Sequence, residues 1–186
     1  ILADTKLERL IVPCSYGNHG RVKKRKQFKN AAKNSYEWLI YHALAHHYRD
    51  EDRIEFQIAN GSHLYLDVYD TTLRFHHGDD VRFWGGVGGL TVPLNKAIDR
   101  WNDYEDADIT CIGHFHQYMS LPYCVVNSSL IGYNEFALSI KAKYEPPQQA
   151  FFLIDSERGK RHSTRIWVDD ESLEHSARES WEDNND

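Results

Sequence analysis

The most informative segment of the chain is Asp108-Ile109-Thr110-Cys111-Ile112-Gly113-His114-Phe115-His116. Its first half is a short apolar run typical of a buried strand, and the run ends in a glycine and two histidines at alternate positions. A glycine at a strand end lets the backbone turn sharply, so that the next side chains can point toward a shared centre. Because two imidazoles leave one strand end, His114 and His116 are predicted metal ligands.

Two other segments have the same form, a strand followed directly by a polar loop in which histidine or asparagine lies beside glycine. They read Cys14-Ser15-Tyr16-Gly17-Asn18-His19 and Phe75-His76-His77-Gly78. Taken alone, a histidine at a strand end is usually a hydrogen-bonded or exposed side chain, and Gly-Asn-His alone is a plausible turn. Strand ends on one edge of a sheet converge, however, so side chains far apart in the sequence can meet there. Imidazole nitrogens with an amide oxygen suit Mn²⁺, Fe²⁺ or Zn²⁺ better than Ca²⁺, so the segments together predict a transition-metal centre.

In their order along the chain, these motifs resemble those of the calcineurin-like metallophosphoesterases, over roughly residues 11–130. The resemblance implies that Asn18, His77 and His114 bind the second metal ion of the site and that His116 binds the first. It places His19 over the scissile phosphate, where the imidazole stabilises charge or protonates the leaving oxygen.

His76 is the alternative ligand to His77, and the family pattern, with the ligand directly before glycine, favours His77. Gly20 stands where many members of the family have an acid that orients the neighbouring histidine. The segment 126–136 further resembles the nuclease-like branch of the family, including enzymes of bacterial viruses.

For the fold, the resemblance implies an α/β (α+β) sandwich of two stacked sheets with helices outside. For the chemistry, it implies two divalent ions, Mn²⁺ first and Fe²⁺ or Zn²⁺ as alternatives, which activate a hydroxide to attack a phosphodiester. The Asp-x-His and Gly-Asp motifs that supply the carboxylate ligands in the family have no counterpart upstream of Gly17. The domain is therefore expected to be incomplete at its amino-terminal side. Those motifs would come from a missing amino-terminal segment or a second chain, and the chain alone is expected to be inactive.

A basic run directly follows the loop that carries His19. It consists of Arg21, Lys23, Lys24, Arg25 and Lys26. Positive charge at the start of a helix opposes the helix dipole, so helix stability does not explain the run. The run indicates a rim that guides a polyanion to the site, which points to nucleic acid as substrate. The non-catalytic alternative is a phosphoesterase-fold module that binds nucleic acid or a protein partner.

Charge divides the chain into a body and a tail. Residues 169–186 hold eight acidic side chains and one basic one, a charge of −7, so residues 1–168 sum to +1 of the net −6. The body is predicted to be the phosphoesterase domain and the tail to be disordered. Three widely spaced cysteines and the lack of a long apolar run favour a cytoplasmic protein with reduced thiols and no membrane span.

Periodicity supplies the remaining expectations of secondary structure. Helices are predicted at residues 1–10, 27–48 and 93–102, and a flexible connector at the glycine-rich segment 85–89. Strands are predicted at residues 11–14, 54–58, 64–68, 72–75, 108–112, 123–126, 135–141, 150–154 and 163–168.

Overall fold

The structure is a computed structural model that describes residues 6–82, 89–139 and 141–168. Helices and strands mix along the chain, and the strands form one five-stranded sheet and two two-stranded sheets. In chain order the elements are β1 (Leu10–Cys14), the 3-10 turns η1 (Phe28–Asn30) and η2 (Ala32–Asn34), α1 (Tyr36–His47), β2 (Ile54–Ile58), β3 (Leu64–Val68), β4 (Thr71–His76), α2 (Thr91–Asn102), β5 (Ile109–Ile112), β6 (Met119–Leu121), β7 (Cys124–Val126), α3 (Glu135–Ser139), β8 (Gln148–Asp155) and β9 (Gly159–Trp167).

The five-stranded sheet has the order β3-β4-β5-β7-β6. Its three central strands run parallel, with Phe75 paired to Cys111 and Cys111 to Val125, while the two edge strands run antiparallel to their neighbours. Of these, β5 and β7 are largely apolar and buried, as is typical of strands covered on both faces. Because they are parallel, their carboxyl ends lie at one edge of the sheet.

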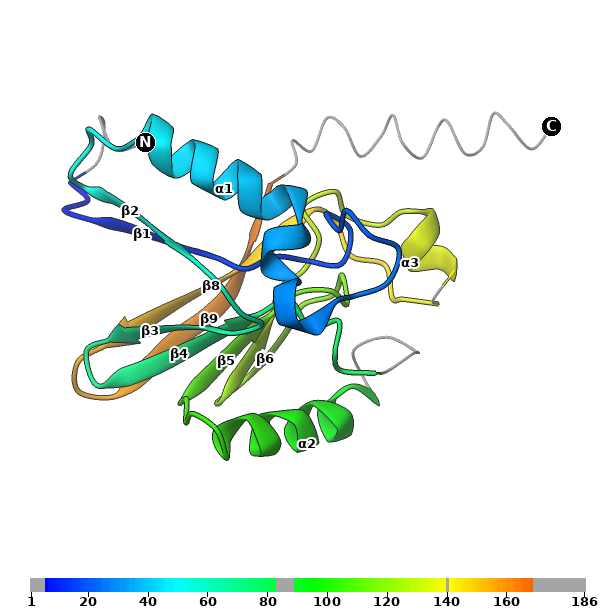
Figure 1. Cartoon of the computed structure of the whole chain (residues 1–186). Coiled ribbons are helices and arrows are strands. Elements are labelled where there is room, and N and C mark those ends of the chain that lie inside the picture. The colour runs from blue at the N-terminus through cyan, green and yellow to red at the C-terminus, as the bar shows by residue number, and fades with distance from the viewer. Residues whose placement is uncertain (1–5, 83–88, 140, 169–186) are drawn as a thin grey trace.

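Different layers cover the two faces of this sheet (Figure 1). Helix α2 covers one face, where Leu90, Leu94 and Ile98 join a core with Ile112 and Val126. The β8–β9 hairpin covers the other face. On that side Ala150, Phe152 and Ile154 pack against Leu73, Ile109 and Val125. The predicted α/β architecture, with stacked sheets and a helix outside, is confirmed.

Strands β1 and β2 pair in parallel and carry α1 beside them. The Ser35 hydroxyl caps the start of α1 by accepting the Glu37 N–H at 3.2 Å. Trp38 packs inward against Tyr16 and its neighbours. The periodic apolar stripe of the helix is exposed instead, with exposed fractions from 40% to 61%, and consists of Tyr36, Leu39, Ile40 and Leu44.

Three sequence predictions of secondary structure need correction. Residues 6–9 are not helical, and Leu10 starts β1 because its N–H donates to Arg53 O. Residues 27–35 form two 3-10 turns, so the predicted helix begins at Tyr36. Glu135–Ser139 is the helix α3 and not a strand, because the Asn134 side chain caps it by accepting the Ala137 N–H at 3.1 Å. Strand β6 was not predicted.

Some predictions fall on residues outside the described ranges, namely the tail 169–186, most of the glycine-rich connector and the first half of the expected helix 1–10. None of the helices in the described ranges has both the length and the hydropathy that a membrane crossing needs.

Arg74 of β4 is fully buried, and it forms no ion pair within the described residues. Its guanidinium donates to Asn102 Oδ1 at 2.7 Å, to Thr110 Oγ1 at 3.3 Å and to the Glu105 carbonyl. Those acceptors lie at the carboxyl end of α2 and on β5. Arg74 therefore fixes the end of α2 to the sheet by hydrogen bonds to neutral groups, since a buried cation needs partners.

We expect Arg74→Met to lower the free energy of unfolding by about 3 kcal/mol, because it removes the donor from one buried and two partly buried oxygens. Urea titration followed by tryptophan fluorescence measures this change. The matched control is Arg100→Met on α2, whose side chain is 79% exposed and should change stability by less than about 0.5 kcal/mol. Equal effects of the two substitutions would contradict the structural role of Arg74.

Candidate metal centre

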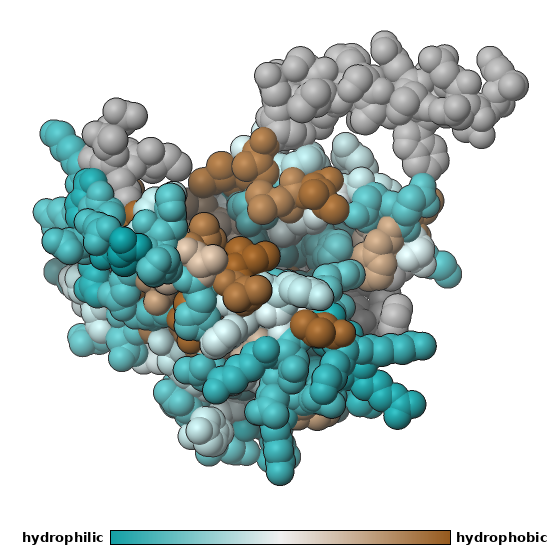
Figure 2. All heavy atoms as spheres, turned by 45° about the horizontal axis from the view of Figure 1, so that its top comes forward, coloured by the Kyte–Doolittle hydropathy of each residue, from teal (hydrophilic) through white to brown (hydrophobic). Residues whose placement is uncertain are grey.

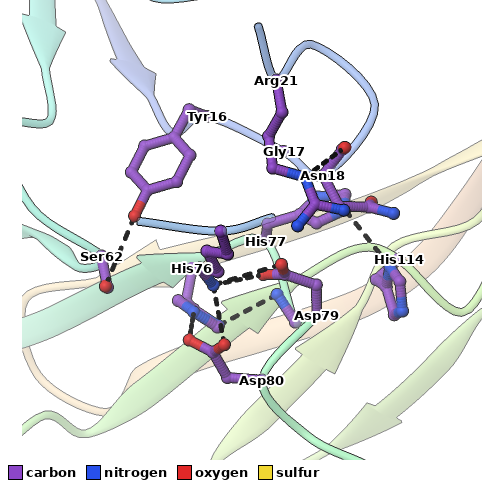
Figure 3. Close-up of polar contacts among 12 residues, drawn as sticks. Tyr16, Gly17, Asn18, Arg21, Ser62, His76, His77, Asp79, Asp80 and His114 are labelled. Carbon is purple, nitrogen blue, oxygen red and sulfur yellow. Dashed lines mark hydrogen bonds and ion pairs between the residues drawn. The ribbon is translucent and has the colours of Figure 1, made fainter. Parts of the chain in front are cut away.

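Three of the loops singled out in the sequence meet at the carboxyl edge of the five-stranded sheet. Asn18 follows β1, His77 directly follows β4, and His114 lies two residues after β5. His77 Nε2 lies 2.7 Å from Asn18 Oδ1, and His114 Nδ1 lies 3.3 Å from His77 Nε2. Figure 3 shows these three side chains turned toward one another. A single amide oxygen and two imidazoles thus form one compact set of possible metal ligands.

The backbone holds the last two loops close together. Gly113 N–H donates to His77 O at 3.0 Å, which continues the pairing of β4 and β5 beyond the strands. Gly78 has a φ of +108°, and a Cβ there would lie 3.2 Å from Gly113 O and from His114 Cβ. A side chain at Gly78 would therefore push the two loops apart, so the close approach of the imidazoles needs glycine.

Burial lowers the pKa values of the imidazoles. The pKa of His77 falls to about 4, first through burial and then through the neighbouring His114. Burial also lowers the pKa values of His114 and His116. Neutral imidazoles keep a lone pair at neutral pH, which is the form that binds a metal ion. The donor set is chemically suited to a divalent transition metal, although it carries no negative charge.

The two other predicted histidines lie around this set. The ring of His116 packs against Phe136 at 5.1 Å, and its Nδ1 is buried without a hydrogen-bond partner among the described residues. A buried polar atom without a partner is costly, so a ligand at this position would relieve a real penalty. His19 is exposed and directly follows Asn18 in the loop after β1, which places it beside the centre.

His76 points away from this set. Its Nδ1 accepts the Gly78 N–H at 2.9 Å, so the ring proton is on Nε2, which lies 3.4 Å from Asp80 Oδ2. The ring also packs edge-on against His63 and at a tilt against Trp101. Both nitrogens of His76 are thus occupied, and of the two histidines it is His77 that lies with Asn18 and His114.

The sequence reading did not single out Asp79 and Asp80. They bind the Lys26 ammonium, with Nζ 3.1 Å from both oxygens of Asp79 and 2.7 Å from Asp80 Oδ1. Hydrogen bonds from His76 and from Lys26 hold the pKa of Asp80 well below its usual range. The ligand atoms of His76, Asp79 and Asp80 lie within 4.8 Å of one another. The ammonium already supplies a cation there, and the proton on His76 Nε2 disfavours metal binding at that nitrogen.

The residues of the basic run differ in the contacts that they make. The Lys26 side chain is 10% exposed and bridges two carboxylates, so it ties the loop to the end of β4. Arg21 Nε donates to Asn18 O at 2.9 Å, and Lys23 contacts Gln27 at 3.2 Å. Lys24 and Arg25 are exposed, and neither forms a hydrogen bond or ion pair within the described residues. Only part of the predicted basic rim is therefore free to meet a ligand.

Glu37 of α1 occupies the position beside Gly20. A Cβ on Gly20 would lie 2.7 Å from the Glu37 carboxyl carbon, and the Glu37 carboxylate accepts hydrogen bonds from Gly17 N–H and the Ser35 hydroxyl. The Glu37 carboxylate of α1 thus fills the space beside Gly20 and is bonded to the same loop. Because Glu37 and Gly20 are far apart in the sequence, the sequence analysis did not predict this contact.

No family model matches the chain, and no curated protein sequence matches it. Among solved structures, a single mutant of Vps29 from Entamoeba histolytica is 13% identical, with 86% of this chain and 98% of that chain covered and a TM-score of 0.42. Vps29 from Cryptosporidium parvum is 10% identical, with 86% and 97% covered and a TM-score of 0.41. An uncharacterised Streptococcus pneumoniae protein described as a predicted phosphoesterase is 12% identical, with 84% and 94% covered and a TM-score of 0.37. Scores this low support no argument about activity.

Lys26→Met should loosen the loop that carries Asn18 and His19, because the apolar side chain cannot bridge Asp79 and Asp80. We expect amide hydrogen exchange in residues 17–26 to become at least about tenfold faster, while exchange in β5 stays unchanged. Lys24→Met removes the same charge from an exposed position and should leave exchange in this loop as it is. An unchanged loop in Lys26→Met would show that the bridge does not hold it.

Proposed function

We propose that the chain carries part of the centre of a metal-dependent phosphoesterase, in which Asn18, His77 and His114 hold a divalent cation. The convergence of one amide oxygen and two imidazole nitrogens, within 2.7 Å and 3.3 Å of their neighbours, carries this proposal. Half-buried neutral imidazoles and an amide oxygen together favour Mn²⁺, Fe²⁺ or Zn²⁺, and Mn²⁺ is our first choice. When bound, such a cation supplies Lewis acidity toward a phosphoryl oxygen.

The neighbouring histidines take different roles in this proposal. His116 would hold the other cation, the first metal ion of the family pattern, and its unpartnered buried Nδ1 supports the presence of a ligand there. His19 is the exposed imidazole of the group and would face the phosphate ester. From that position it would donate a proton to the leaving oxygen or stabilise the charge that develops on it.

The complete site needs negative charge that this donor set lacks. Asp79 and Asp80 are held by Lys26, and within the described residues neither carboxylate forms a hydrogen bond or ion pair with Asn18, His77 or His114. Two adjacent cations repel each other unless carboxylates bridge them. We propose that the Asp-x-His and Gly-Asp motifs of the family come from a preceding segment or from a second chain, and that residues 1–186 alone do not turn over substrate.

Nucleic acid is the substrate class that we propose. Lys24 and Arg25 are exposed beside the loop of the centre, and Phe28 close behind them is 73% exposed. Positive charge binds a phosphate backbone, and an exposed aromatic ring can stack on a base. Arg21 and Lys23 would join this surface, whereas Lys26 would hold the loop in place.

One observation favours the non-catalytic alternative, a module that binds a protein partner. The outward stripe of α1 exposes four large apolar side chains, which a monomer in water would normally bury. Under this alternative, a partner would cover α1, and substitutions in the histidine centre would not affect its binding. A pull-down with His114→Ala against one with Leu39→Asp separates the two functions.

Calorimetry should detect weak binding of one cation, with Zn²⁺ bound more tightly than Mn²⁺, because the three ligands are neutral. His114→Ala should weaken Zn²⁺ binding at least about tenfold. His47→Ala is the matched control, since His47 is exposed on α1 and should leave the affinity unchanged. Rapid metal-dependent hydrolysis of bis(4-nitrophenyl) phosphate by the 186-residue chain would contradict the need for added carboxylates.

The triple substitution of Lys23, Lys24 and Arg25 by alanine should weaken binding of a single-stranded oligonucleotide. Each lost phosphate contact lowers the log–log salt slope by about 0.7, so the slope should fall by about 2. Fluorescence anisotropy at several salt concentrations measures this slope. Alanine at Arg49, Lys96 and Lys143 removes equal charge elsewhere, and an equal effect of this control would point to net charge instead of a local surface.

A further inference from the structure

The loop between β5 and β6 carries two residues in an unusual backbone conformation. His114 and His116 have φ angles of 68° and 58°, in the left-handed region that is unfavourable for residues other than glycine. Residues keep such a conformation only where the surrounding structure holds them in it. The contacts that hold this loop therefore decide where the His114 imidazole points.

The sheet and its core fix the first half of this loop. Gly113 N–H donates to His77 O at 3.0 Å. The Phe115 side chain, between the two histidines in the sequence, is 7% exposed and joins the core that α2 covers. Pairing within the sheet resumes only at Met119, opposite Val126. The residues between Phe115 and Met119, His116 among them, therefore need other partners.

The segment before β8 supplies partners for the second half of the loop. Gln117 Nε2 donates to Lys143 O at 3.1 Å, and Tyr118 N–H donates to Glu145 Oε2 at 2.9 Å. The bond to Glu145 starts from the main chain, two residues after His116. It therefore restrains the backbone of the loop directly, and Glu145 is the side chain that makes this restraint.

One oxygen of Glu145 gathers donors from three segments of the chain. Besides the Tyr118 amide, Oε2 accepts hydrogen bonds from Ser128 Oγ at 3.0 Å and from Gln148 Nε2 at 2.6 Å. Ser128 lies in the loop after β7 and Gln148 begins β8, and both are buried. The carboxylate thus joins the loop after β5, the loop after β7 and the start of β8 at a single point.

Glu145 differs in this respect from an ordinary surface carboxylate. Hydrophilic side chains surround the hydrophobic middle of the face shown in Figure 2, and exposed groups of this kind need only water as a partner. Glu157, in the turn between β8 and β9, is exposed, and its carboxylate forms no hydrogen bond or ion pair within the described residues. Glu145 is half-buried, and its three donors fix where its oxygen lies.

We propose that Glu145 is a positioning residue of the metal centre, which holds the loop of His114 and His116 in the conformation that brings the His114 imidazole to His77. This role rests on the proposed function, because the centre itself is part of that proposal. The three contacts are hydrogen bonds to one oxygen, so the position requires an acceptor at the right reach. The length of the side chain should therefore matter more than its charge.

Two substitutions in the whole chain separate reach from charge. Glu145→Asp keeps the charge but shortens the side chain by one C–C bond, about 1.5 Å, so one oxygen can no longer meet all three donors. Glu145→Gln keeps the length and an acceptor oxygen but loses the charge. By calorimetry, Glu145→Asp should weaken Zn²⁺ binding at least about tenfold, whereas Glu145→Gln should stay within about twofold of the wild type. Glu157→Asp is the matched control and should leave the affinity unchanged.

NMR in EDTA tests the same role without metal. In Glu145→Asp, the Tyr118 amide should exchange at least about tenfold faster, and the nuclear Overhauser effect between the rings of His77 and His114 should be lost. Both should persist in Glu145→Gln. Failure of the wild type to bind Zn²⁺ would refute the proposed function, and the ring contact would still decide the role of Glu145. An unchanged ring contact in Glu145→Asp, or an equal loss in Glu145→Gln, would overturn that role.

Discussion

The candidate centre depends on the parallel pairing of β4 with β5. Parallel strands end at the same edge, and the hydrogen bond from Gly113 N–H to His77 O extends this pairing into the loops. An antiparallel arrangement would send one of the two imidazoles to the opposite edge of the sheet. The register matters as much as the direction. His76 pairs with Ile112, so His77 lies beside Gly113, and His114 follows directly.

Once the strand ends are fixed, local backbone geometry selects which side chains meet. His76 and His77 are neighbours, yet they face different surroundings because side chains alternate along a strand. The buried His76 contacts His63, Trp101 and Asp80, whereas His77 turns to Asn18. Beyond the strand end, Asp79 and Asp80 both turn to Lys26, so a charged group and a neutral one lie within a few residues of each other.

Sequence patterns located the strands and the loops that carry Asn18, His77 and His114, because hydrophobic periodicity and glycine positions are local signals. They could not locate Asp79 and Asp80 as partners of Lys26, since that contact joins residues far apart in the chain. For the same reason, Lys26 looked like its neighbours in the basic run, and Glu37 gave no sign that it lies beside Gly20. The exposed stripe of α1 shows that periodicity identifies a helix without saying which of its faces is buried.

His114 and His116 both adopt positive φ angles, of 68° and 58°. This region of the Ramachandran map costs most for β-branched residues and least for glycine, and asparagine tolerates it well. The backbone conformation therefore limits which amino acids these two positions accept, independently of any role in metal binding. In a library that varies both, folded members should be rich in asparagine and glycine and poor in valine and isoleucine, even under a selection that ignores function altogether.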